Sequence, residues 1–524
     1  MDAGRRSWVI MALVACTVLV WSLSYTCAQE PPTGDPSGTQ TGTIADVPAK
    51  EQGQPTLTEL GEAVGHNRVA INMTWTLSTG YLVMFMAAGF ALVAAGFTRA
   101  KNVSHTVSMV FMVYAAGTLG WWIMGFALMF GGLGAIGTLG GSAVLDTEAT
   151  LTLFGKPWGL FGLKGFFLSG TTYDVGVFAI FLFQKVFMDT ANYIPTGAMA
   201  ERWKFLSFFL YTLFMSMFLY PLFGNWVWGG GWLSQLGVNF GIGHGHVDFA
   251  GSSVVHMVGG VCALAGAIAL GPRIGKYTHD GRPMPLPGHN IPMAILGTFI
   301  LAFGWFGFNP GSTLAGTDLR IAVIAVNTML ASAAGAVMAM IYMWFKVGKP
   351  DPTMMANGML AGLVAITAPC AFVNSPSAVI IGLVAGVLVV ESAFFLERRL
   401  KVDDPVGAIS VHGTCGAWGV ISLGLFADGT YGDGLNGVAG TVRGLFYGDP
   451  SQLMAEIIGA LTNFVFIFVA SMIFFKIVDM LVGNRVPAEV ELEGLDVPEM
   501  GVPGYTEYLP RPAEGSFGES SVSV

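Results

Sequence analysis

The stretches DFAGSSVVH at residues 248–256 and DPVGAISVH at residues 404–412 are two copies of one pattern. In each copy an aspartate stands eight residues before a histidine, and a glycine occupies the fourth place. Apolar segments surround both copies, where polar residues are costly and usually functional. A repeated polar pattern within apolar segments is typical of transporters built from internal repeats. The fold class therefore depends on how many membrane crossings separate the two copies.

The composition excludes several classes of protein. Of 524 residues, 53% are hydrophobic and only 11% are charged, whereas a soluble globular chain carries about 25% charged residues. This deficit of charge excludes a soluble enzyme, a disordered chain and a nucleic-acid-binding protein. The five cysteines show no CxxC spacing, so neither a metal cluster nor a disulfide framework is expected. We expect no cofactor and no catalysis, because no nucleophile constellation, GxGxxG loop or P-loop is present.

Eleven apolar windows follow residue 70, and each is long enough to cross about 30 Å of hydrocarbon. The sequence therefore predicts an all-α polytopic membrane protein. The windows lie near residues 73–97, 104–131, 174–198, 204–226, 250–271, 291–309, 319–345, 353–373, 376–396, 406–427 and 453–480.

The basic residues of the connections predict the orientation in the membrane. Connections after odd-numbered windows carry most of them: Arg99, Lys101, Arg202, Lys204, Arg273, Lys276, Arg282, Lys346, Lys349, Arg398, Arg399, Lys401 and Arg485. The alternate connections carry only Lys156, Lys164, Arg320 and Arg443. The positive-inside rule then places the N-terminus outside and the C-terminus in the cytoplasm. We expect a multi-pass protein of the cell membrane, in contact with lipid.

The N-terminal residues resemble a secretory signal peptide. Arg5 and Arg6 precede an apolar run that ends near Tyr25, and a small-residue site follows at Cys27 and Ala28. The alternative is an uncleaved first membrane helix. We expect a cleaved signal peptide over 1–28, a loose, polar extracytoplasmic segment over 29–69, a membrane domain over 70–481 and a cytoplasmic tail over 482–524.

The two copies of the repeat lie in the fifth and tenth windows, so they cross the membrane in opposite directions. This predicts a five-plus-five inverted repeat followed by a final helix. Eight helical residues rise about 12 Å, which brings His256 and His412 toward the same middle depth. Imidazole can pass a proton without keeping a charge, so the pair predicts a pore site. The alternative is that the histidines only bridge helices. Asp248 and Asp404 are expected to cap their helices.

Aromatic residues stand at the predicted outer ends of the fourth and sixth windows, and others lie on the third. Rings near an outer mouth suit a small, weakly hydrated cation through cation–π attraction. The alternative is an interfacial aromatic belt, which membrane proteins commonly carry. The residues concerned are Phe183, Phe187, Trp228, Trp305 and Phe308, together with the hydroxyl of Ser312.

Seven ordered stretches resemble the ammonium transporter family (Amt/MEP/Rh). The resemblance covers about residues 70–497, and Trp228 favours the Amt branch. The stretches are FQKVF at 183–187, GAMAER at 197–202, WGGG at 228–231, DFAG at 248–251 with His256, HNIPM at 289–293, GWFGFNPGS at 304–312 and DDPVGAISVHG at 403–413.

The resemblance implies a role for each matching residue. Phe187, Trp228 and Ser312 would recruit ammonium at the outer face, and Asp248 would favour the cation without touching it. Phe187 and Phe308 would form a gate of stacked rings. The paired pore histidines would be His256 and His412. The resemblance also implies a homotrimer and a PII-type regulatory protein that binds the cytoplasmic tail.

The leading functional hypothesis is a transporter that deprotonates ammonium and conducts ammonia, with separate transfer of the proton. Three alternatives stay open. The first is a passive ammonia channel, and the second is an ammonium sensor or receptor. The third is a membrane enzyme in which the two histidines bind haem or a metal.

Some charged residues do not belong to the general family pattern. Lys185 and Asp189 stand four residues apart in one window and are expected to form a neutralising ion pair, with a subfamily-specific role as the alternative. His244 and His246 are expected to be solvated loop residues. Glu391 is expected to be structural.

Overall fold

The computed structural model describes residues 42–140 and 143–506. The predicted signal peptide over 1–28 therefore lies outside the described residues. The chain divides into two compact units, Met1–Arg68 and Val69–Val524, and helix α2 (Leu57–Phe97) contributes residues to both.

The N-terminal unit departs from the expected loose segment over 29–69, because α2 begins at Leu57. The Thr56 amide donates to the Glu59 carboxylate at 2.8 Å, and the Glu59 amide donates to the Thr56 hydroxyl at 3.3 Å. This reciprocal pair is a capping box, which starts a helix by satisfying free N–H groups. A short turn at Ile44–Asp46 precedes it and is capped in the same way by Thr43.

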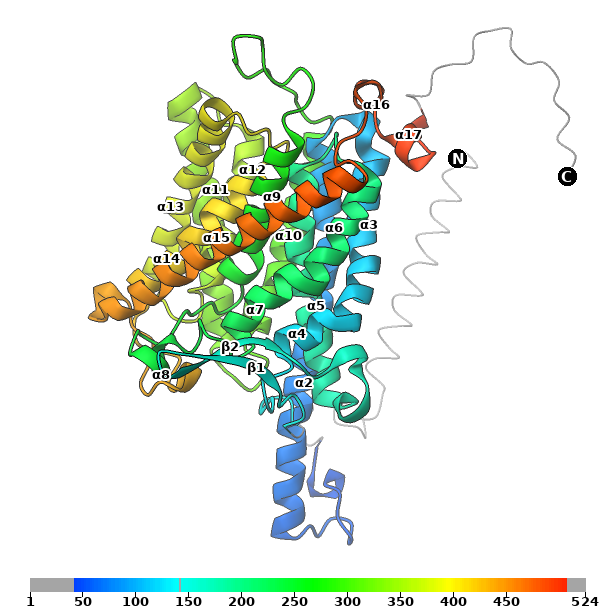
Figure 1. The fold of residues 1–524 in the computed structure, drawn as a ribbon. Coiled ribbons are helices and arrows are strands. Elements are labelled where there is room, and N and C mark those ends of the chain that lie inside the picture. The colour runs from blue at the N-terminus through cyan, green and yellow to red at the C-terminus, as the bar shows by residue number, and fades with distance from the viewer. Residues whose placement is uncertain (1–41, 141–142, 507–524) are drawn as a thin grey trace, which may run out of the picture. The chain divides into compact units, whose positions relative to one another are not determined.

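Ten helical segments of the described chain are long and apolar enough to cross a membrane (Figure 1). A shorter apolar helix, α12 (Pro352–Thr367), completes the predicted set of eleven, and the all-α polytopic fold is confirmed. The ten segments are α2; Ala100–Phe130 with α3 (Val103–Gly120) and α4 (Phe126–Phe130); α5 (Val175–Ala198); Phe205–Trp228 with α6 (Phe205–Phe214) and α7 (Tyr220–Trp228); Ser252–Leu270 ending in α9 (Val258–Leu270); α10 (Ile291–Gly311); α11 (Ile321–Val347); Ser375–Leu400 beginning with α13 (Ser375–Phe395); Ile409–Phe426 ending in α14 (Cys415–Phe426); and α15 (Pro450–Leu481).

Helix α12 is shorter than its predicted window because it ends at Thr367, two residues before Pro369. Proline has no N–H group to donate to the next helical hydrogen bond. The helix end is completed by the segment that follows Asp248. The Ser252 hydroxyl donates to the Val364 carbonyl and accepts from the Ala368 amide, both at 2.7 Å.

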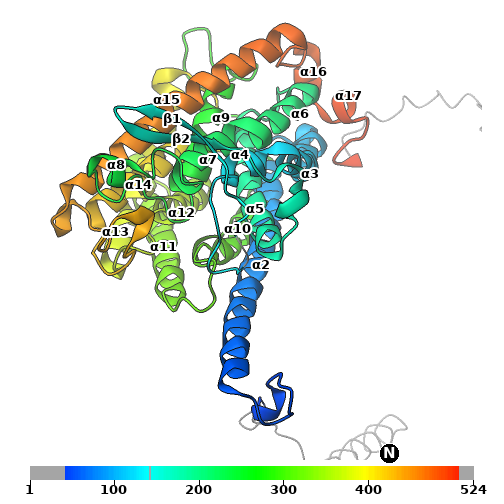
Figure 2. The same ribbon diagram turned by 60° about the horizontal axis from the view of Figure 1, so that its bottom comes forward.

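The connection between α4 and α5 contains an antiparallel hairpin that the sequence did not predict. Its strands are β1 (Glu148–Leu153) and β2 (Lys156–Gly162), joined by a tight turn at Phe154 and Gly155. Figures 1 and 2 show the hairpin near the short helix α8 (Leu236–Phe240), at the end of the membrane unit opposite to α16 (Ala488–Glu493) and α17 (Asp496–Met500).

The two copies of the repeated pattern adopt the same local structure. Each histidine lies in a six-residue π-helical segment, Ser252–Met257 in one copy and Ile409–Thr414 in the other. The equivalent glycines, Gly251 and Gly407, both have positive φ angles, of 120° and 81°. A side chain is strained at such angles, which explains the glycine at this place of the pattern.

The connections predicted to be cytoplasmic meet at one end of the membrane unit. Arg273 donates two hydrogen bonds to Asp403, at 2.8 and 2.9 Å, and its guanidinium lies 3.2 Å from the Glu201 carboxylate. Glu201 also pairs with Arg99, and the Arg202 guanidinium donates to the Asp403 carbonyl at 2.8 Å. These five residues, here called the basic-end network, join four connections that are far apart in the sequence.

Replacing Asp403 with asparagine should lower the thermal stability of the purified protein by about 5 °C, because it leaves Arg273 partly unpaired in a buried place. Burial favours the neutral acid, but Arg273 and Arg202 outweigh this effect and hold the pKa of Asp403 well below its usual range. The carboxylate is therefore ionised and stabilising at neutral pH, and this contribution is lost only in strong acid.

Thermal unfolding followed by size-exclusion chromatography measures the effect. The matched control is Asp280→Asn, which removes the exposed ion pair with Arg282 in the connection that also carries Arg273. That change should shift the midpoint by less than about 1 °C. Equal shifts in both variants would contradict a stabilising role for the network.

Candidate functional site

The aromatic residues predicted from the sequence form one cluster. The rings of Phe187 and Phe308 are stacked with centroids 4.0 Å apart and an angle of 24° between their planes. Phe183 lies 4.7 Å from Phe187, and Trp228 meets Phe187 edge-on at 6.2 Å. The three phenylalanines are fully buried inside the membrane unit, so they do not belong to a lipid-facing belt. A belt would expose these rings at the interface with lipid.

Ser312 and Trp228 form the half-buried edge of this cluster. The Ser312 hydroxyl donates to the carbonyl of Phe308 at 2.8 Å. The indole N–H of Trp228 donates to the carbonyl of Asp248 at 2.6 Å. Trp228 is therefore oriented by the backbone at the start of the first repeat.

Both repeat aspartates cap their helical segments, as the sequence predicted. Asp248 accepts four backbone N–H groups, from residues 251 to 254, at 2.7–2.9 Å. The hydroxyl of Ser253 donates a fifth hydrogen bond to Asp248 at 2.8 Å. Asp404 accepts the amides of Val406, Gly407 and Ile409 at 2.7–3.3 Å. Five donors fill the lone pairs of a carboxylate, so Asp248 is a fixed anion next to Trp228.

The two repeat histidines lie side by side. The Nδ1 atoms of His256 and His412 are 3.2 Å apart, a contact in which one nitrogen donates to the other. His256 is also stacked on Trp305 at 5.1 Å and on Phe308 at 5.4 Å. The rings of Phe187, Phe308, His256 and His412 therefore form one continuous column. The Nε2 atom of His256 has no hydrogen-bond partner among the described residues.

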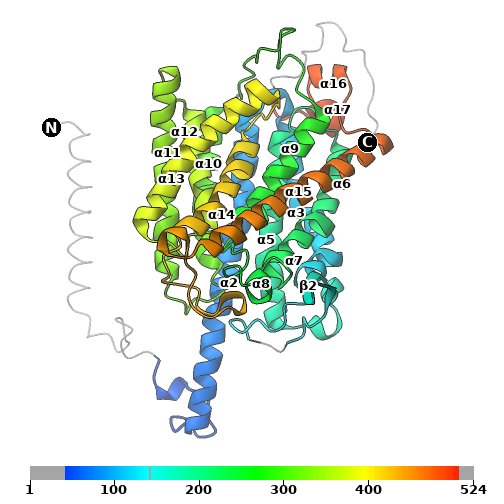
Figure 3. The same cartoon turned by 60° about the vertical axis from the view of Figure 1, so that its left-hand side comes forward.

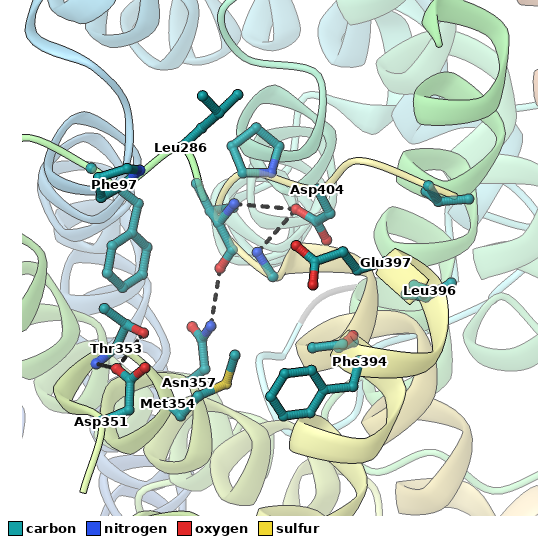
Figure 4. A pocket seen from close by; sticks show the side chains of 18 of the residues that line it. Phe97, Leu286, Asp351, Thr353, Met354, Asn357, Phe394, Leu396, Glu397 and Asp404 are labelled. Carbon is teal, nitrogen blue, oxygen red and sulfur yellow. Dashed lines mark hydrogen bonds between the residues drawn. The ribbon is translucent and has the colours of Figure 1, made fainter. Parts of the chain in front are cut away.

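Two cavities continue from His412 toward the end that carries the basic connections. The first holds about 30 Å³, and apolar side chains such as Phe90, Leu360 and Val411 line most of it. That volume suits one molecule of the size of water. The second cavity holds about 330 Å³ and is lined by the carboxylates of Asp351, Glu397 and Asp404 (Figure 4).

Asn357 and Val406 line both cavities and mark the place where they meet. The Asn357 amide donates to the Val406 carbonyl at 3.1 Å, a bond drawn in Figure 4. The first cavity is mostly apolar, whereas a larger share of the lining of the second is polar and includes three carboxylates. A passage of this kind favours a neutral solute beside the histidine and a charged one beyond Asn357.

The prediction of solvated side chains at His244 and His246 is wrong, because both are buried. His246 lies between the Glu456 carboxylate, at 2.6 Å, and the Ser253 hydroxyl, at 2.9 Å. His244 contacts the Gly440 carbonyl at 3.0 Å. No pairing of His246 could be predicted from local patterns, because its partner Glu456 follows 210 residues later. The one feature of the sequence that could have indicated a buried partner is Glu456, a single glutamate in the last apolar window.

The remaining charged residues pair as expected. The Lys185 ammonium lies 2.6 Å from Asp189, and both side chains are buried. The ammonium also lies over the ring of Tyr114 at 3.7 Å, which adds a cation–π contact to the ion pair. Glu391 contacts Lys346 and the hydroxyl of Tyr342.

Known proteins show which family has this arrangement. Residues 74–505 match the Ammonium Transporter Family. Ammonium transporter Amt2 of Archaeoglobus fulgidus is 44% identical over 469 residues, which cover 89% of this chain and 93% of the relative. Ammonium transporter 1 member 2 of Oryza sativa is 37% identical, over 77% of this chain and 79% of the relative.

Solved structures show the same fold. The Sensor Amt Protein is 34% identical with a TM-score of 0.72, and the match covers 83% of this chain and 99% of that one. Mep2 of Candida albicans is 25% identical with a TM-score of 0.66, over 80% and 87% of the two chains. The family match, the relatives and the fold agree with the column of rings, and this chain therefore belongs to the ammonium transporter family as a multi-pass membrane transporter of ammonium.

Proposed function

We propose that the protein binds ammonium at the outer aromatic cluster, removes one proton there and conducts neutral ammonia past His256 and His412. The observation that carries this proposal is the continuous column of four rings, which leads from the cluster to an apolar cavity beside His412. The proton crosses separately, along the two imidazoles and transient water.

The physical reason for deprotonation is the cost of burying a charge. Moving a bare cation into a medium of low dielectric constant costs on the order of tens of kcal/mol, whereas a neutral amine avoids this penalty. Potassium ions cannot lose a proton, so the same step rejects them. The His256–His412 pair supports this proposal, because imidazole offers nitrogen atoms for hydrogen bonding without adding a fixed charge.

At the outer face, Phe187, Trp228 and Ser312 recruit the cation. The rings offer their negative faces, and the Ser312 oxygen can accept a hydrogen bond from ammonium. Asp248 attracts the cation from a distance, since its own lone pairs are filled by five donors. The Phe187–Phe308 stack is a gate that must shift for each molecule to pass, with Phe183 and Trp305 packed beside it.

The positive-inside rule supports a cytoplasmic location for the basic-end network and for the tail helices α16 and α17. The tail contacts one connection and the first turns of α3 and α6 there. Glu491 accepts the amide of Ile274, Asp496 accepts the amide of His105, and Glu499 accepts the amide of Phe205. We propose that a PII-type protein acts on this tail, and that three chains assemble into a homotrimer with one pore each, as the family resemblance implies.

The decisive experiment is a current measurement on the full-length protein reconstituted in a supported bilayer. Ammonium pulses should give a current and equal pulses of potassium should not. Equal currents with both ions would contradict the deprotonation step. An ammonia flux without any current would favour the passive channel.

Binding of ammonium with neither flux nor current would favour the sensor or receptor. That alternative is kept because the solved Sensor Amt Protein shares this fold at 34% identity.

Replacing Trp228 with leucine should raise the ammonium concentration for half-maximal current about tenfold, because a partly desolvated cation–π contact is lost. The maximal current should change less, because the column of rings from Phe187 to His412 is unchanged. The control is Trp122→Leu, which alters a tryptophan exposed on the outside of the described membrane unit. A similar shift in both variants would show that Trp228 does not recruit the cation.

A further inference from the structure

Four buried side chains form an unbroken hydrogen-bonded chain beside the outer site. The carboxylate of Asp248 accepts from the Ser253 hydroxyl at 2.8 Å, and the same hydroxyl lies 2.9 Å from Nε2 of His246. Nδ1 of His246 lies 2.6 Å from the carboxylate of Glu456. None of the four residues is more than 4% exposed. The chain therefore links the final helix α15 to the anion at the start of the first repeat.

The number of donors fixes the direction of each bond. Asp248 already accepts four backbone N–H groups, so its carboxylate is ionised and the Ser253 hydroxyl must donate to it. The Ser253 oxygen is then free only to accept, which requires a proton on Nε2 of His246. Nδ1 and the Glu456 oxygen are both acceptors unless a proton lies between them. A contact of 2.6 Å therefore means that His246 and Glu456 share one proton.

The surroundings hold the His246–Glu456 pair in this arrangement. The other Glu456 oxygen accepts the Val247 amide at 3.0 Å and the Gln452 side-chain amide at 2.7 Å. The imidazole rests against Gly459 of α15, where a Cβ atom would lie 2.2 Å from Nδ1. Figures 1 and 3 show α15 running obliquely across the membrane unit, and its contacts with α9 and α14 keep Glu456 in place.

We propose that His246 and Glu456 are positioning residues for the outer ammonium site, which they control by fixing Ser253 and Asp248. This inference rests on the proposed function. The pair contains one shared proton and so adds no net charge, which leaves Asp248 as the net negative charge of the chain. The Asp248 carbonyl in turn holds the indole N–H of Trp228 at 2.6 Å. The chain of contacts thus ends on the ring that recruits the cation.

The pair acts through these contacts and not on the cation itself. His246 and Glu456 are both completely buried, and beyond the contact between them their side chains form the described hydrogen bonds with Ser253, Val247 and Gln452. Burial disfavours a charged imidazole, but the neighbouring Glu456 carboxylate outweighs this effect and raises the pKa of His246, with a smaller contribution from Asp248. The pair therefore holds its shared proton more firmly than a solvated imidazole would.

The test is a comparison of ammonium currents from full-length variants in a supported bilayer. His246→Ala and Glu456→Ala should each raise the half-maximal ammonium concentration about tenfold, because a hydrogen bond to a charged group loses its alignment. The maximal current should stay within about threefold of the unchanged protein. Glu456→Gln should restore the half-maximal concentration to within about twofold, since its amide can donate to Nδ1 and its oxygen can accept from Val247.

Two further variants keep the test informative if a single change prevents folding. The double change His246→Leu with Glu456→Leu removes both polar groups at once, which proteins often tolerate, and it should show the same loss of affinity. His244→Gln is the control, because His244 lies in the same loop but contacts Gly440 and not Ser253. This control should leave both current parameters unchanged.

Three results would overturn the inference. One is an unchanged half-maximal concentration in a double variant that assembles normally. Another is a Glu456→Gln protein as impaired as Glu456→Ala, which would make the charge itself the important property. The third is a large fall in maximal current at unchanged affinity, which would place the pair on the route of the transported proton. If the unchanged protein gave no ammonium current, the proposed function would fail instead.

Discussion

Replacing both His256 and His412 with alanine should lower the ammonium current at least about 100-fold while the protein still assembles. A positioned proton-transfer group typically contributes 10²–10⁴-fold to a rate. The two imidazoles are in contact, so either one alone can keep part of the proton route open. The double change removes the whole pair and leaves an apolar gap between Phe308 and the inner cavity. Currents from equal amounts of reconstituted protein measure the effect.

Assembly and specificity are checked in parallel. Size-exclusion chromatography should give the same profile for the double variant as for the unchanged protein. The control is His279→Ala, which alters an exposed histidine between α9 and α10 and should leave the current unchanged. Selective ammonium uptake at the normal rate in the double variant would refute a role for the pair in transport.

Replacing Asp248 with alanine should reduce ammonium transport at least about 100-fold and should also destabilise the protein. The change leaves four buried N–H groups and the Ser253 hydroxyl without their acceptor, and each unmade bond of this kind costs about 1–3 kcal/mol. It also removes the anion that attracts the cation toward Trp228. Uptake assays together with thermal unfolding separate the two effects.

Asp404→Ala is the matched comparison, because Asp404 caps the equivalent segment of the second repeat. It should reduce stability in the same direction without raising the half-maximal ammonium concentration at the outer face. Equal losses of affinity in both variants would mean that capping alone explains the role of Asp248.

The sequence predicted most of the fold because the decisive features are local. Apolar windows, basic connections and an aspartate eight residues before a histidine can be recognised without any knowledge of contacts. The eleven apolar helices, the caps at Asp248 and Asp404 and the Lys185–Asp189 pair all followed from such patterns. The resemblance to the family rested on ordered motifs, and the match of residues 74–505 to the Ammonium Transporter Family confirms it.

The features that the sequence did not predict depend on distant contacts or on weak local preferences. His246 stood among glycines and looked solvated, because its burial depends on Glu456 in the last helix. The hairpin β1–β2 alternates over only a few residues, which gives a weak signal beside long apolar windows. The early start of α2 could have been recognised from the capping box of Thr56 and Glu59.

The basic-end network restricts how this protein can move during transport. Arg202 and Arg273 lie in the connections that follow the third and fifth apolar helices, whereas Asp403 stands before the tenth. Carriers that rock one bundle against another to alternate access would have to break these buried ion pairs in every cycle. Such a penalty is incompatible with rapid turnover. We propose that the substrate advances through a rigid scaffold by small rotations of the ring column, as in a channel, while the ion pairs of the basic-end network stay closed.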